Sequence, residues 1–157
     1  MIAGTGDKSK LSLKLTRTCE ALGIGLARGG YGLVTGAWPG VDQAVIRSFV
    51  EELELDAPDA SLDSRLMYVM TRNRKPPLEV GQLRSVTKGE AEYTESIHQA
   101  QFVILVGGAG GTLEIGQRAH AAGLPVLPLA DTGGAARKLH QQLLADQEAS
   151  GSEQDCR

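Results

Sequence analysis

FVILVGGAGGTLEIGQRAHAAGLPVLPL, from Phe102 to Leu129, is the stretch of the chain that decides the fold. Its first five residues are all apolar, which is typical of a parallel strand covered on both faces. A glycine-rich turn follows, then a helical segment over residues 112–122, then a second apolar run over residues 125–129. Strand, turn, helix and strand in this order predict a unit in which the two strands lie parallel.

The same alternation continues on both sides of this unit. Apolar residues at spacings of three and four predict an amphipathic helix that ends at Gly29-Gly30; these residues are Leu11, Leu15, Cys19, Leu22 and Leu26. The remaining pattern predicts strands over residues 31–36 and 66–70, and helices over residues 40–53, 92–99 and 135–144. Residues 71–89 show little periodicity and are predicted to be the longest irregular connection.

These elements predict an α/β fold: a Rossmann-like open parallel sheet of about five strands, with helices on both faces and right-handed crossovers. The length of 157 residues is that of one domain, which we place at residues 1–145. Residues 146–157 are polar and are predicted to form a disordered tail.

Composition excludes several classes of partner. The net charge is −3 and only 4% of residues are aromatic, so neither a basic surface nor a set of stacking rings is available for nucleic acid. No apolar run approaches the roughly 20 residues that span a bilayer, and the two cysteines do not form a disulfide framework. We therefore expect a cytoplasmic protein without a membrane partner. The three histidines, His98, His120 and His140, lack metal-ligand spacing, so we expect no metal site and no cofactor.

Four glycine-rich loops follow the predicted strands, at residues 4–6, 36–40, 107–112 and 131–134. In open parallel sheets, ligands bind beyond the carboxyl ends of the strands. A glycine-rich turn that enters a helix exposes free backbone N–H groups at the positive end of the helix dipole. The four loops therefore predict a phosphate or ribose site, although glycines also serve simply to pack helices against a sheet.

Two known phosphate-binding motifs are absent from the longest loop. The dinucleotide fingerprint needs a third glycine where Leu113 stands, and a Walker loop needs a lysine after Gly111, where Thr112 stands. We predict that the ligand is held by loop residues instead: Gly4, Thr5, Gly6, Gly36, Ala37, Trp38, Gly107, Gly108, Ala109, Gly110, Gly111, Thr112, Thr132, Gly133 and Gly134. Trp38 is either a wall for a ligand ring or an anchor in the core.

The segments GLVTGAWPGVDQAV, FVILVGGAGGTLEIGQRAHAAGLPVLPL and DTGGAA resemble the SLOG superfamily, which joins LOG-type lysine-decarboxylase-like proteins with nucleotide-binding relatives. The resemblance covers residues 1–144. LOG enzymes cleave the N-glycosidic bond of nucleoside monophosphates with a P-G-G-x-G-T-x-x-E motif and an arginine in the preceding helix. Here Val106 replaces the proline, the loop is one residue longer, and residues 92–96 contain no arginine.

The segments GLVTGAWPGVDQAV and LPVLPLADTGGAA look closer to SLOG sensor domains, which accompany TIR or Sir2 domains in bacterial anti-phage defence. This resemblance implies that Arg84, or in its place Arg72 or Arg74, contacts the ligand together with Glu114. Glu114 also lies in the first turn of its predicted helix, where a carboxylate stabilises the helix dipole in any protein. The arginines could equally be solvated surface residues.

The leading hypothesis is a module that binds an ADP-ribose or cyclic ADP-ribose-like nucleotide signal. The resemblance implies a homo-oligomer and a TIR-type or other effector, either as a fused domain or as a partner. The alternative is a LOG-like phosphoribohydrolase in which Glu114 is catalytic. A scaffold subunit whose glycine loops only pack helices is the third hypothesis.

Overall fold

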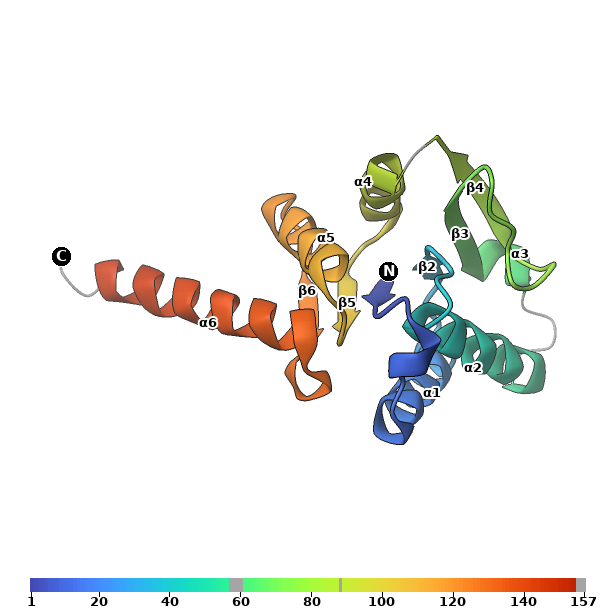
Figure 1. The fold of residues 1–157 in the computed structure, drawn as a ribbon, viewed down its shortest axis with the longest axis horizontal. Helices are drawn as coiled ribbons and strands as arrows, with labels where there is room; N and C mark the ends of the chain where they lie inside the picture. The colour runs from blue at the N-terminus through green and yellow to red at the C-terminus, as the bar shows by residue number, and fades with distance from the viewer. Residues whose placement is uncertain (57–60, 88, 155–157) are drawn as a thin grey trace.

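The computed structural model describes residues 1–56, 61–87 and 89–154 (Figure 1). In this part of the chain the strands are β1 (Ile2–Gly4), β2 (Leu33–Thr35), β3 (Leu66–Thr71), β4 (Gln82–Val86), β5 (Val103–Val106) and β6 (Val126–Leu129). The helices are α1 (Leu13–Arg28), α2 (Val41–Asp56), α3 (Leu62–Arg65), α4 (Gly89–Gln99), α5 (Gly110–Ala121) and α6 (Gly134–Gln154). Two short 3₁₀ turns, η1 (Lys8–Lys10) and η2 (Ala130–Thr132), follow β1 and β6.

All assigned strand pairs are parallel, and helices cover both faces, so the predicted fold class is confirmed. The expected single sheet of about five strands is wrong in detail. The described strands form two three-stranded sheets, in the orders β1-β5-β6 and β2-β3-β4. β1 and β2 lie in contact, but no ladder is assigned between them in the described chain. The two sheets therefore meet at β1 and β2.

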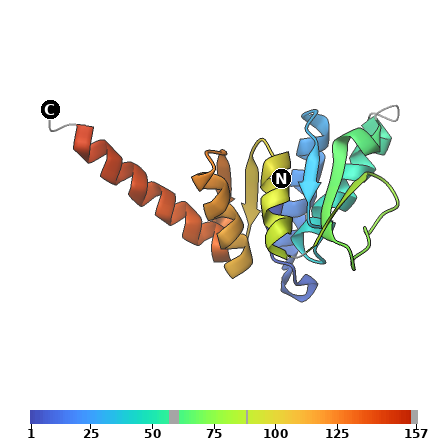
Figure 2. The same cartoon turned by 90° about the horizontal axis from the view of Figure 1, so that it is seen from above.

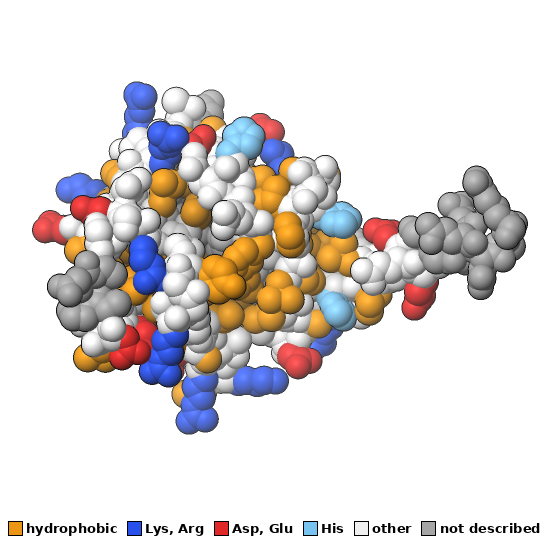
Figure 3. Space-filling view, turned by 180° about the vertical axis from the view of Figure 1, so that it is seen from behind, with side chains coloured by type: hydrophobic (Ala, Val, Ile, Leu, Met, Phe, Trp, Pro, Cys, Tyr) orange, Lys and Arg blue, Asp and Glu red, His pale blue; other side chains and the backbone are white. Residues whose placement is uncertain are grey.

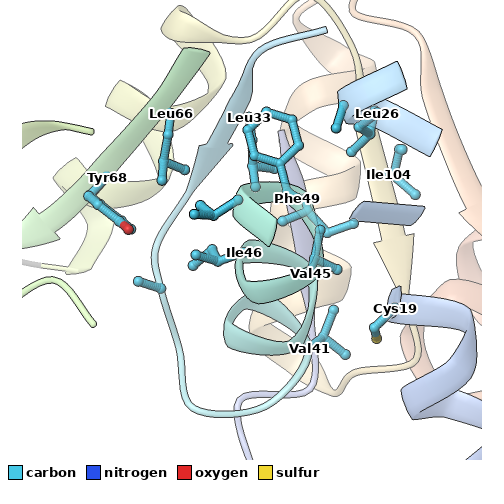
Figure 4. Close-up of a cluster of buried hydrophobic side chains, with 14 of the residues drawn as sticks. Cys19, Leu26, Leu33, Val41, Val45, Ile46, Phe49, Leu66, Tyr68 and Ile104 are labelled. Atoms are coloured by element: carbon cyan, nitrogen blue, oxygen red, sulfur yellow. The ribbon is translucent and has the colours of Figure 1, made fainter. Parts of the chain in front are cut away.

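Alternate residues of the strands point to two separate cores. Ile2 and Ile104 belong to a cluster with Val45 and Phe49 of α2, shown in Figure 4. Ala3 and Leu105, the next residues along β1 and β5, point to the opposite face and pack in a second cluster with residues of α4, α5 and α6. This is the period of two that a strand buried on both faces requires.

The largest error in the sequence prediction concerns residues 71–89, which contain the strand β4. Four of its five residues are exposed, so no apolar pattern marks it in the sequence. It is held by parallel pairing with β3, from Gln82 opposite Met67 to Val86 opposite Thr71. Backbone hydrogen bonds at a sheet edge leave no hydrophobic pattern in the sequence, and this explains the miss.

The C-terminal segment also differs from expectation. Residues 146–154 were predicted to be disordered, but α6 continues through them to Gln154; residues 155–157 lie outside the described part. Among the α6 residues whose side chains are described, the buried ones are Ala135, Ala136 and Leu139 in the first turns. The rest of the helix extends away from the body of the molecule (Figure 2). Its helical form therefore depends on local backbone hydrogen bonds rather than on packing.

The surface and the helices bear on two further predictions. In the described chain, no helix is long and apolar enough to span a bilayer. Hydrophobic side chains gather near the middle of the face seen in Figure 3. Exposed apolar patches often mark protein contacts. The homo-oligomer nevertheless stays a prediction, as does the cytoplasmic location.

Candidate functional site

A pocket of about 300 Å³ opens at the carboxyl ends of β1 and β2 and at the N-terminus of α5. This is the edge where open parallel sheets bind ligands. Eight of the residues predicted from the glycine loops line it: Gly4, Thr5, Gly6, Gly36, Trp38, Ala109, Gly111 and Thr112. Three of the four loops therefore meet at one cavity, and the predicted contact of their residues with a ligand stays a prediction.

The other predicted residues do not line this pocket. They are Ala37, Arg84, Gly107, Gly108, Gly110, Glu114, Thr132, Gly133 and Gly134. Several of them support the loop that does. The Thr132 hydroxyl oxygen accepts a hydrogen bond from the N–H of Gly107 at 2.7 Å, and the N–H of Ala135 donates to the Gly108 carbonyl at 3.0 Å. The fourth glycine loop thus holds the third in place from behind.

The loop between β5 and α5 takes a backbone shape that favours glycine. Gly107 and Gly108 have φ angles of +59° and +88°. A Cβ on Gly108 would lie 2.2 Å from the hydroxyl oxygen of Thr112. That hydroxyl donates to the carbonyl of Gly4 at 3.0 Å, which joins the start of α5 to the end of β1. Side chains at these glycines would therefore disrupt the wall of the pocket.

The N-cap residue of α5 is Ala109, and no side chain of the described residues accepts a hydrogen bond at this N-terminus. The first N–H groups of a helix have no partner within the helix and carry partial positive charge. Ala109, Gly111 and Thr112 line the pocket, so these N–H groups lie at its wall. The arrangement suits a bound anion such as a phosphate.

Arg74 contacts Trp38, which lines the same pocket. Its guanidinium carbon lies 3.8 Å from the centre of the Trp38 ring, close enough for a cation–π interaction. Nη2 of Arg74 donates to the carbonyls of Gly36 at 2.7 Å and Ala37 at 3.2 Å. Arg74 therefore fixes the loop after β2. Trp38 is 42% exposed, so it is not a core anchor and its ring is accessible beside the pocket.

Arg74 also forms an ion pair with Glu92 of α4, with Nη1 3.0 Å from Oε1. Glu92 is 3% exposed and lines the pocket. Burial raises the pKa of its carboxyl, and Arg74 opposes part of that rise. A buried carboxylate with a bound guanidinium thus forms part of the pocket wall.

A second buried carboxylate comes from Asp42, in the first turn of α2. Its Oδ2 accepts from the Thr35 hydroxyl at 2.9 Å and from the N–H of Trp38 at 3.4 Å. Burial raises the pKa of Asp42 to about 6, although these hydrogen bonds favour the charged form. Carboxyl groups with shifted pKa values inside a cleft are candidates for function.

The two charged residues implied by resemblance lie elsewhere. Glu114 is half-exposed on α5 and pairs with Arg118 one turn later, with 2.6 Å between Oε1 and Nη2. Arg84 is an exposed residue of β4 and pairs with Glu95 of α4 at 2.8 Å. Arg72 is exposed and directly follows the last residue of β3. Their roles toward a ligand stay predictions.

Sequence reasoning missed Asp42, Glu92 and the neighbouring Ser96, all of which line the pocket. One signal was available for Asp42: it is a lone acid within an otherwise apolar helix start, directly after a glycine loop. Glu92 and Ser96 gave no such signal, because polar residues on a short helix are normally solvated. For metal binding, no group of three or more His, Cys, Asp or Glu side chains is placed together in the residues that the structure describes.

Comparison with known proteins identifies the fold. No protein-family model matches the chain, and no curated protein matches it in sequence. Among solved structures, the structural-genomics protein TM1055 superposes with a TM-score of 0.73 at 24% identity, covering 89% of this chain and 78% of the other. The molybdenum cofactor carrier protein of Chlamydomonas reinhardtii superposes, in two structures, with TM-scores of 0.70 and 0.71 at 20% identity.

The chain shares the fold of that carrier protein. The two superpositions cover 92% of this chain and 82% or 84% of the carrier. These superpositions therefore confirm the Rossmann-like architecture that the sequence predicts. At this level of identity the likeness extends to the fold and not to the ligand.

Proposed function

We propose that the chain binds a phosphorylated small molecule of nucleotide type in the pocket beside α5. The observation that carries this is the uncapped, glycine-built N-terminus of α5, which opens into a cavity that also holds Trp38 and two buried carboxylates. The helix N-terminus provides the phosphate site. The exposed Trp38 ring provides a surface for a flat ring.

The volume of the pocket indicates the size of the ligand. Small-molecule sites have volumes of roughly 300–1,000 Å³, and this pocket, at about 300 Å³, lies at the lower end. It fits one nucleotide better than a dinucleotide such as NAD. The ADP-ribose and cyclic ADP-ribose ligands implied by the sensor branch are therefore tested beside mononucleotides. A sensor role in anti-phage defence would require that one of these ADP-ribose compounds binds.

A titration followed by melting temperature tests the proposal. The probes are AMP, GMP, ADP-ribose, the cyclic ADP-ribose isomers and NAD, since a ligand of the folded state must raise the melting temperature. We expect a concentration-dependent rise with at least one mononucleotide. If none of these compounds raises it, the proposed function is rejected.

One variant locates the phosphate within the pocket. A Cβ on Gly110 would meet no atom within 4 Å, so Gly110→Asp fits the fold and places a negative charge at the α5 N-terminus. The new carboxylate competes with a phosphate, and we expect affinity to fall by at least about tenfold while stability is kept. Gly25→Asp, at an equally open glycine of α1, is the matched control. Equal affinity in both variants would refute a phosphate at α5.

Hydrolysis of the N-glycosidic bond is the second candidate function. The observation in its favour is that Asp42 and Glu92 line the pocket, because a carboxylate stabilises the oxocarbenium charge of such a reaction. Incubation of the protein with AMP or GMP, followed by chromatography for free base, measures it directly. Base release would establish an enzyme; binding without release would establish a carrier or sensor.

A further inference from the structure

Several pocket atoms, among them Oδ1 of Asp42 and Oγ of Ser96, have no hydrogen-bond partner in the described part of the chain. Asp42 uses only Oδ2, and Ser96 of α4 makes no side-chain hydrogen bond, although the two residues are only 3% and 1% exposed. Within the same part of the chain, only the Tyr68 hydroxyl is fully buried without a partner. Oδ1 of Asp42 and Oγ of Ser96 are therefore reached from the pocket that both residues line.

Buried polar atoms in native proteins almost always have a partner. An ionised carboxylate can only accept hydrogen bonds, so a ligand that displaces water from Oδ1 of Asp42 must supply a donor in its place. The Ser96 hydroxyl both donates and accepts, and is compatible with either kind of group. The pocket therefore combines N–H donors at α5 with a deep acceptor at Asp42. A matching ligand carries a phosphate at one end and hydrogen-bond donors at the other.

The neighbouring side chains indicate a ring rather than a sugar as the source of these donors. Ala3, Ile115 and Tyr93 line the same pocket. Ribose hydroxyls against Ala3 and Ile115 would lose their hydrogen bonds to water without replacement. A heteroaromatic ring buries its flat faces against such side chains and keeps its polar groups at the edge.

We propose, building on the proposed phosphate site, that Asp42 selects a ligand ring whose edge carries a ring N–H beside an amino group. Guanine and the pterins share this edge. Adenine presents an acceptor at the corresponding ring position, which would face the carboxylate oxygen without a hydrogen bond. The site therefore distinguishes purines by their edge and not by their size.

Calorimetric titration of the full chain with GMP, IMP, AMP, ribose phosphate and neopterin monophosphate tests this selection. A hydrogen bond to a charged group contributes roughly 1.5–3 kcal/mol, or about ten- to 150-fold in affinity. We expect GMP or neopterin monophosphate to bind at least about tenfold more tightly than AMP, with IMP between them because it lacks the amino group. Whichever of GMP and neopterin monophosphate binds more tightly shows whether the preferred ring is guanine or a pterin. AMP binding as tightly as both would overturn the selection.

Asp42→Asn provides the decisive variant. Its carbonyl oxygen can still accept from Thr35 and Trp38, so the amide nitrogen replaces Oδ1 and turns the acceptor into a donor. We expect GMP to weaken by at least about tenfold and AMP to gain, while ribose phosphate is unchanged. Asp63→Asn is the matched control, since its Oδ1 can still accept from Gly81 far from this pocket.

The outcomes separate the two proposals. If no probe binds, ribose phosphate included, the phosphate site itself fails. If the probes bind and Asp42→Asn weakens all of them equally, the phosphate site stands and the ring selection is wrong. Ser96→Ala gives an independent reading should Asp42→Asn not fold: a several-fold loss for GMP with no loss for ribose phosphate supports the selection, and equal losses oppose it.

Discussion

Two arginine–glutamate pairs of the molecule, Arg74 with Glu92 and Arg118 with Glu114, differ in almost every respect. Arg74 and Glu92 are 18 residues apart in the sequence, and their side chains are 20% and 3% exposed. Arg118 and Glu114 are four residues apart on one helix, and theirs are 36% and 48% exposed. Only the first pair includes a residue that lines the pocket.

The difference shows that Glu114, the acidic residue of the glycine-rich motif, is separate from the polar residues that line the pocket. Glu114 follows the glycine loop in sequence, and a helix places it on the outer surface of α5. Glu92 comes from another helix and is held by an arginine from the loop after β3. The four predictions below test this contrast, beginning with the largest expected effect.

Arg74→Met is expected to have the largest effect on stability. It leaves the carboxylate of Glu92 buried without its cation and removes the donors to the carbonyls of Gly36 and Ala37. Breaking one side of a buried pair costs about 3–5 kcal/mol. Arg118→Met, the matched control, removes only exposed pairs and is expected to leave stability unchanged within error. Urea unfolding of both variants measures the difference.

The double variant Arg74→Met with Glu92→Gln checks the cause. If the loss arises from an unpaired buried charge, neutralising Glu92 restores part of the stability. A double variant no more stable than Arg74→Met alone would show that Arg74 acts through its backbone contacts and through Trp38.

Asp42→Asn is expected to stabilise the protein at neutral pH. Burial raises the pKa of Asp42 from its ordinary value of 3.8 to about 6 in the folded state. The folded state thus binds this proton more tightly than the unfolded state, and the free energy of unfolding falls as pH rises from about 4 to about 6. The variant avoids this loss and should gain about 1–3 kcal/mol at pH 7, with no gain below about pH 4.

Urea unfolding at several pH values, with Asp63→Asn beside it, measures this effect. A variant less stable than the wild type at pH 7 would mean that the hydrogen bonds from Thr35 and Trp38 need the charged carboxylate. A gain at pH 7 would show that the protein keeps a destabilising charge in the pocket, which is typical of functional residues.

The fold and three of the pocket's loops were predictable because they depend on local patterns. The buried strand at Val103–Val106 and the glycine loop that follows need no knowledge of distant residues. β4 was not predictable, since its exposed residues are held by pairing with β3 alone. The long helix α6 was missed because composition suggested disorder while the backbone forms helix to Gln154.

The polar residues of the site could not be predicted from the sequence, because they come from separate helices. Asp42 lies on α2, and Glu92 and Ser96 lie on α4. The fold brings these two helices to the same cavity. Glu92 and Ser96 look like ordinary surface residues in the sequence, yet all three residues are at least nine-tenths buried. The sequence prediction favoured Arg84 and kept Arg72 and Arg74 as alternatives. In the structure it is Arg74 that contacts two residues lining the pocket, Glu92 and Trp38.

The pH dependence of ligand binding is expected to show a smaller effect. The proposed contact with the ring edge needs the ionised form of Asp42, and a carboxyl with a pKa of about 6 is protonated at pH 5. GMP affinity should therefore fall by about tenfold from pH 7.5 to pH 5. Ribose phosphate, measured in parallel, corrects for the titration of the phosphate itself. Asp42→Asn should remove the remaining dependence, and a dependence that persists in it would assign the proton to another group.

Glu114→Gln is expected to have the smallest effect. It tests whether Glu114 contacts the ligand, as the resemblance implies, or stays outside the pocket, as in the structure. If Glu114 contacts the ligand or acts in catalysis, as the family resemblance implies, the variant loses affinity or activity. Its side chain instead pairs with Arg118 outside the residues that line the pocket, and exposed pairs contribute little. We therefore expect GMP affinity within about twofold of the wild type. A tenfold loss would show that Glu114 contacts the bound ligand, as the resemblance implies.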